Sequence, residues 1–178
     1  IPVGGNSDVH INTSSISVIG LGEDVNIYHP IRINASNIII KGLIFLDGSQ
    51  IILTTASNSK IINNKFISIS GFVIIDQDYG NNDIALANNI FTGNSYGFSV
   101  GGALIDENSG GGSNNYIHNN LFQSNAKGIE VPGWSINNNI FISNAWCLKS
   151  QNYDSYNNFD GNSNIYEDGG NNLSPGSM

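Results

Sequence analysis

The sequence predicts an all-β solenoid, because a short motif returns along the chain in register with alternating apolar positions. The motif is Asn-Asn-x-Phe, and the steps between its Phe residues, about 18 to 31 positions, suit one coil of a repeat array better than separate domains. We therefore expect a single domain over residues 1–178, about seven coils long, with regular coils over about 37–166. The copies are NNKF at 63–66, NNIF at 88–91, NNLF at 119–122, NNIF at 138–141 and the divergent YNNF at 156–159.

Apolar columns around each Phe indicate short strands with one buried face. Five residues before the Phe, an inward column is formed by Ile40, Ile61, Leu86, Ile117 and Ile136. The position seven residues after the Phe is again apolar, which predicts that its side chains point inward. The position eight residues after the Phe becomes polar toward the C-terminus, which predicts that its side chains point outward. The inward column comprises Ile52, Val73, Phe98, Ile129 and Leu148, and the outward column Leu53, Ile74, Ser99, Glu130 and Lys149.

Asparagines form columns of their own, which predict sharp corners and a side-chain ladder along the axis. Asn tolerates the left-handed backbone that a corner requires, and identically stacked amides can hydrogen-bond to one another. A corner role is favoured over ligand binding. One column stands two residues before the Phe (Asn64, Asn89, Asn120, Asn139) and the other three residues after it (Asn94, Asn125, Asn144).

Composition excludes several classes of function. The chain has six Lys+Arg against fourteen Asp+Glu, a net charge of −8, so it lacks the basic footprint of a nucleic-acid-binding protein. No segment approaches the roughly 18 apolar residues of a membrane-spanning helix, so membrane insertion is not expected. The single Cys147 lies in an apolar run, which predicts a buried, inert thiol. Because the chain begins at Ile1, we expect a secreted, extracellular or cell-surface protein whose signal peptide has been removed.

The repeat I-x-N-N-x-F, as in Ile61-Ile62-Asn63-Asn64-Lys65-Phe66, resembles that of the pectate-lyase-like parallel β-helix superfamily. The resemblance implies a right-handed, three-sided parallel β-helix over roughly residues 16–166. The F-x-x-N motif with Gly101-Gly102-Ala103-Leu104 also resembles the repeats of polymorphic-membrane-type and autotransporter adhesins, although only one such copy is present. This architecture carries enzymes and adhesins alike, so the fold alone leaves the function open.

One reading is a polysaccharide lyase-like enzyme acting on an acidic polysaccharide with Ca²⁺. Asp76 and Asp78 flank a turn, and Asp106 opens a polar excursion at about 105–115, so these three are candidate metal ligands. The alternative for these acids is a solvated corner. Such an enzyme also needs a base, and Arg32, the only arginine, stands far upstream of them in sequence.

We favour the other reading, a non-catalytic structural, filament-forming or adhesive module without a cofactor. No helix is predicted to cap the solenoid, so its end coils would expose strand edges through which copies could associate. Aromatic rings and polar side chains on the corner and sheet that follow each Phe suit a polysaccharide partner, although packing under a loop is the alternative for the rings. The candidate glycan-contacting residues are Tyr96, Lys127, Glu130, Trp146 and Lys149.

Overall fold

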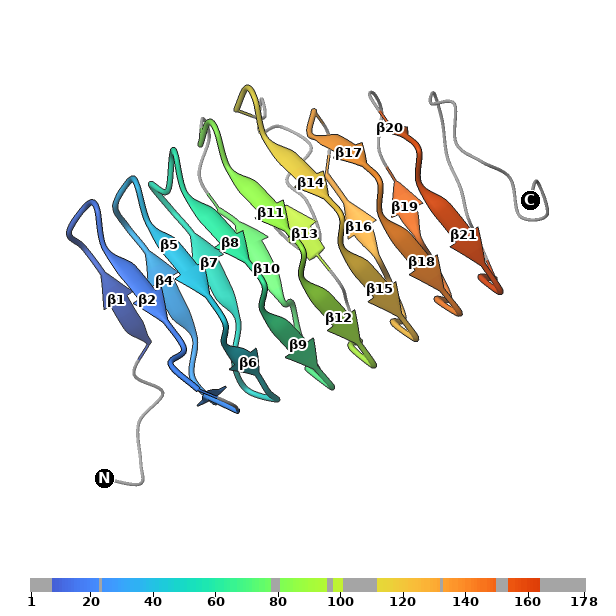
Figure 1. Cartoon of the computed structure of the whole chain (residues 1–178), viewed down its shortest axis with the longest axis horizontal. Helices are drawn as coiled ribbons and strands as arrows, with labels where there is room; N and C mark the ends of the chain where they lie inside the picture. Colours follow the sequence, from blue (N-terminus) through green and yellow to red (C-terminus); the bar gives the residue numbers. More distant parts are fainter. Residues whose placement is uncertain are drawn as a thin grey trace.

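The chain winds into a parallel β-solenoid of about six turns, as Figure 1 shows. The computed structural model describes residues 8–22, 24–77, 81–95, 98–100, 112–131, 133–149 and 154–163. Within these residues every regular element is a strand, and the chain passes through three seven-stranded parallel sheets in turn. The all-β, parallel β-helix fold predicted from the repeats is therefore confirmed, and the coiling is consistent with the right-handed form.

Each sheet takes one strand from every coil. The first sheet contains β1 (Val9–Ile11), β4 (Ile31–Ile33), β7 (Ile51–Leu53), β10 (Ile74–Asp76), β13 (Phe98–Val100), β16 (Ile129–Glu130) and β19 (Leu148–Lys149). The second contains β2 (Ser17–Ile19), β5 (Ile39–Lys41), β8 (Lys60–Ile62), β11 (Ala85–Ala87), β14 (Tyr116–His118), β17 (Ser135–Asn137) and β20 (Asp154–Ser155). The third contains β3 (Asn26–Ile27), β6 (Ile44–Phe45), β9 (Lys65–Ile67), β12 (Ile90–Thr92), β15 (Leu121–Gln123), β18 (Ile140–Ile142) and β21 (Asn158–Asp160).

A stack of phenylalanine rings fills the core behind the third sheet. The strands pair in register, so the Phe of each coil lies directly against the Phe of the next, with ring centroids 4.6 to 5.0 Å apart. Near-parallel rings at this spacing add attraction to the gain from burying their area. The Ile and Leu column five residues before the Phe is also completely buried, as predicted. The stack consists of Phe45, Phe66, Phe91, Phe122, Phe141 and Phe159.

The two asparagines of the motif have different structural roles at the corner between the second and third sheets. The first adopts the left-handed conformation, with φ of 56° at Asn63 and 57° at Asn119, and is exposed. The second is buried and bonds along the axis: the backbone N and Nδ2 of Asn89 both donate to Oδ1 of Asn120, at 2.8 and 3.1 Å. Asn120 repeats the same pair of bonds to Asn139 at 2.9 and 3.0 Å. A second ladder of the same kind joins Asn94, Asn125, Asn144 and Asn162 at the following corner.

The predicted register of the first sheet is wrong for the coils after Phe45 and Phe66. Strand pairing places Ile51 against Ile74, and both side chains are completely buried, so these two residues share the inward column. Leu53, which we expected to face outward, is fully buried. The corner before the sheet varies in length, so the paired strand positions come six residues after Phe45, eight after Phe66 and seven after Phe91.

No helix among the described residues is long and apolar enough to cross a membrane.

Candidate functional site

Two of the predicted glycan-contacting side chains lie on neighbouring coils at the corner that leads into the first sheet. Trp146 is 49% exposed, and Lys127 is half-buried on the preceding coil. The backbone binds the two coils closely here, because Gly128 N donates to Trp146 O at 2.7 Å and Ile129 N donates to Cys147 O at 2.8 Å. An indole face and an ammonium group are therefore presented on adjacent rungs of a rigid scaffold.

The backbone brings two further candidates beside this corner. Glu130 in β16 pairs with Lys149 in β19, and Ser99 of β13 lies on the other side of Glu130. Tyr96 lies outside the described residues. Four of the five predicted residues thus come from two adjacent coils. We name these four the corner surface: Lys127, Glu130, Trp146 and Lys149.

Tight packing beneath the corner surface fixes its geometry. A Cβ on Gly128 would overlap the carbonyl oxygen of Cys147, so only glycine permits this approach. The Cys147 thiol is buried, as predicted, and burial raises its pKa from an ordinary 9.0 to about 12. The thiol is therefore neutral at physiological pH and serves as core packing rather than as a nucleophile.

Of the three acids proposed as metal ligands, Asp76 alone belongs to the described residues. Asp76 occupies the inward column next to Leu53 and is only 5% exposed. Its Oδ1 accepts a 2.6 Å hydrogen bond from Nδ2 of Asn81. This Nδ2 also donates to Thr54 O, and Oδ1 of Asn81 accepts from Ala56 N. Asp78 and Asp106 lie outside the described residues, and no group of three His, Cys, Asp or Glu residues that could hold a metal ion occurs in the described part of the chain.

Arg32 lies much closer to Asp76 than their sequence separation suggests. Its Nη1 donates to Oε1 of Gln77, the residue after Asp76, at 3.0 Å, and its Nη2 contacts Oδ2 of Asp8 at 3.3 Å. Because β4 and β10 flank β7 in the first sheet, the Arg32 side chain passes over β7, where Ile52 is buried although it faces outward. The guanidinium is outside the solenoid, whereas the Asp76 carboxylate faces its core.

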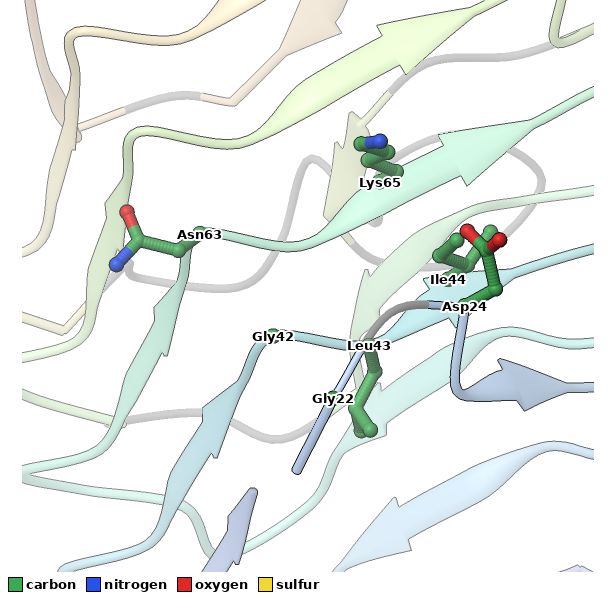
Figure 2. A pocket seen from close by; sticks show the side chains of 7 residues that line it. All are labelled: Gly22, Asp24, Gly42, Leu43, Ile44, Asn63 and Lys65. Carbon is green, nitrogen blue, oxygen red and sulfur yellow. The ribbon is translucent and has the colours of Figure 1, made fainter. Parts of the chain in front are cut away.

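A hollow of about 450 Å³ opens at the corner between the second and third sheets, near the first coils (Figure 2). Asp24 and Lys65 bring opposite charges to its wall, and Leu43 and Ile44 add apolar surface. Left-handed residues with small or short side chains, Gly42 among them, leave the space at this corner. Sequence reasoning missed the hollow because its residues come from three coils, and the first of them precedes the Asn-Asn-x-Phe repeats.

Comparison with known protein families, curated proteins and solved structures finds no match for this chain.

Proposed function

We propose that this chain is a non-catalytic, extracellular β-solenoid module that presents the corner surface to glycans. The observation that carries the proposal is the exposed indole of Trp146 on the coil next to Lys127. An aromatic face packs against the C–H face of a pyranose ring, and a neighbouring ammonium donates hydrogen bonds to hydroxyl or carboxylate oxygens. The stacked Phe rings and Asn ladders support the same role, because they hold the surface rigid before binding and so reduce the entropic cost of association.

A glycan array probed with the purified chain tests this function. We expect binding to a subset of glycans, lost by at least tenfold in Trp146→Ala and weakened in Lys127→Ala. Tyr116→Ala is the matched control, since Tyr116 is also an exposed aromatic side chain but lies on the second sheet. Absence of binding to any glycan, or binding that Trp146→Ala leaves unchanged, would overturn the proposal.

We also propose that the chain belongs to the pectate-lyase-like parallel β-helix superfamily. The three parallel sheets, the Phe stack and the Asn ladders support this placement at the level of architecture. An experimental structure compared with superfamily members would test it, and a different coil cross-section or handedness would contradict it.

Self-association through the end coils is a second role, favoured by the exposed apolar residues of the first coil. Strands β1, β2 and β3 are the edge strands of their sheets, and Val9, Ile19 and Leu21 are all exposed there. Unpaired strand edges beside apolar side chains are templates for pairing with another chain. Electron microscopy of the purified chain at high concentration would show filaments or regular oligomers, whereas dispersed particles would rule out this role.

The lyase alternative keeps one supporting observation, the position of Arg32 beside the end of β10. Against it, the Asp76 carboxylate faces the core. An assay for lyase activity tests this alternative. It follows the release of unsaturated products from uronate polymers by ultraviolet absorbance, once with Ca²⁺ and once with a chelator. Product formation that the chelator stops and Arg32→Ala abolishes would replace the non-catalytic proposal.

A further inference from the structure

The hollow in Figure 2 is lined by two opposite charges that do not neutralise each other. The carboxylate of Asp24 and the ammonium group of Lys65 both belong to its wall, and both side chains are exposed. Neither side chain forms an ion pair or a hydrogen bond with another residue in the described part of the chain. A hollow that offers an unpaired anion and an unpaired cation is complementary to a ligand that carries both charges.

The two charges come from coils that are not adjacent. Strand pairing aligns Asn26 of β3 with Ile44 of β6, and Ile44 with Lys65 of β9, and Asp24 lies two residues before Asn26. The backbones that carry the charges are therefore two strand spacings apart along the axis, ~10 Å. The coil between them contributes the half-buried side chain of Ile44 to the wall. The hollow thus has a negative end, an apolar middle and a positive end.

Hydrogen bonds between coils fix the backbone around the hollow. Ile44 N donates to Val25 O at 2.9 Å, and Lys65 N donates to Leu43 O at 2.9 Å. Its volume of about 450 Å³ lies within the ~300–1,000 Å³ of small-molecule sites. Only the two charged side chains have to become ordered when a ligand enters, which keeps the entropic cost of binding low.

We propose that this hollow binds short peptides with free ends, with the ammonium end at Asp24 and the carboxylate end at Lys65. The two ends of an extended dipeptide are ~7 Å apart, and the flexible four-carbon stem of Lys65 lets its ammonium group span the remaining distance. An apolar side chain of the peptide packs on Ile44. Net charge selects the same ligand, because a chain with a charge of −8 repels an anion, whereas a peptide with both ends free is neutral.

The expected affinity is low, because both ends of the hollow are open to water. Water screens ion pairs between exposed groups, so each pair contributes little. We expect a dissociation constant on the order of 1 mM, and a loss of about threefold to fivefold when one pair is removed. The site is separate from the glycan-binding function proposed above, since no residue of the corner surface lines the hollow.

A titration of the isotope-labelled chain with leucyl-leucine, followed by the NMR shifts of backbone amides, tests the proposal. We expect saturable shifts around residues 22–24, 42–44 and 63–65. Asp24→Asn should weaken binding of the free dipeptide about threefold to fivefold, but should not affect its N-acetyl form, which lacks the ammonium group. Lys65→Gln should weaken binding of the free dipeptide equally, but should not affect its C-terminal amide. Lys60→Gln is the matched control, since Lys60 is an exposed lysine of the second sheet that does not line the hollow.

Three results would overturn the peptide site. The first is the absence of saturable shifts around the hollow. The second is equal binding of the free, N-acetylated and amidated dipeptides, which would show that neither terminal charge is recognised. The third is a loss in Lys60→Gln as large as in Lys65→Gln, which would assign the binding to general charge attraction.

Discussion

Gly128 lies so close to the backbone carbonyl of Cys147 that the next coil leaves no room for a side chain at residue 128. The contact sits directly beneath Lys127 and Trp146, each of which immediately precedes one of the two residues. The spacing of the corner surface therefore depends on one glycine.

Gly128→Ala should lower the free energy of unfolding by about 1–3 kcal/mol, because the new methyl group overpacks a backbone contact that cannot yield. The same change should weaken any glycan binding, since the coil carrying Trp146 must shift. Urea denaturation followed by circular dichroism measures the first effect. Gly71→Ala is the control, because a Cβ there meets no atom within 4 Å. Equal stability of the two variants would contradict the argument.

Asn120→Ala should destabilise the protein by about 3 kcal/mol, since it removes a buried rung. The substitution takes Asn120 away from the backbone N of Asn89 and from the Leu86 carbonyl, whereas Nδ2 of Asn89 still donates to Ile61 O. Each buried group left unsatisfied costs about 1–3 kcal/mol. Asn119→Gly, one residue earlier, keeps the left-handed corner and should cost a few tenths of a kcal/mol. The urea midpoints of the two variants show whether the ladder bonds of Asn120 stabilise the protein more than the corner conformation of Asn119. Similar losses in both would show that corner conformation, not the ladder, dominates.

The structure explains which parts of this fold can be predicted from sequence. Phe91 and Asn120 belong to columns that recur in every copy of the motif, so aligning the repeats identifies both the ring stack and the ladder. A fixed offset fails at Leu53, because the corner after Phe45 is one residue shorter than the corner after Phe91. The same variation carries Asp76 into the core column, where a polar residue has no periodic signal.

The candidate site is less predictable than the fold for a related reason. The position five residues after each Phe holds a different residue type in every coil, so Lys127 and Trp146 are not repeated elsewhere in that column and no recurring residue identifies the site. Their proximity follows from coil stacking, which sequence alignment does predict, but exposure depends on the local corner. The hollow beside Asp24 joins three coils, of which only the one with Asn63 and Lys65 carries the Asn-Asn-x-Phe motif, so the repeat alignment gave no signal for it.

Tyr156→Asn should raise the free energy of unfolding by about 1 kcal/mol. Tyr156 occupies the left-handed corner with φ of 57°, where the four preceding copies of the motif have Asn. This conformation strains a side chain other than Gly, Asn or Asp by roughly 1–2 kcal/mol. The ring is 74% exposed, so little packing is lost. Thermal and urea unfolding measure the gain. Tyr116→Asn, at an exposed tyrosine within strand β14, should give none, and a gain there as large as at residue 156 would refute the corner explanation.

Cys147 should resist alkylation in the folded chain at pH 8 and react at the rate of a free thiol in urea. Burial holds the thiol neutral, with its pKa raised to about 12. The unfolded thiol ionises near its ordinary pKa of 9.0, so stability is unaffected below that pH and falls progressively as pH rises from about 9 to 12. Iodoacetamide labelling followed by mass spectrometry measures the rate. Rapid labelling without denaturant would show that the thiol is accessible.

The asparagine ladder also makes the coils interchangeable. In each internal Asn of the ladder, Oδ1 accepts a hydrogen bond from the Asn of the preceding coil, and Nδ2 donates one to Oδ1 of the Asn in the following coil. Each junction between coils therefore has the same hydrogen bonds. Removing residues 120–138 would place Asn139 where Asn120 stood, with the same Phe two positions later. A chain built in this way can be lengthened or shortened by whole coils without redesigning a junction.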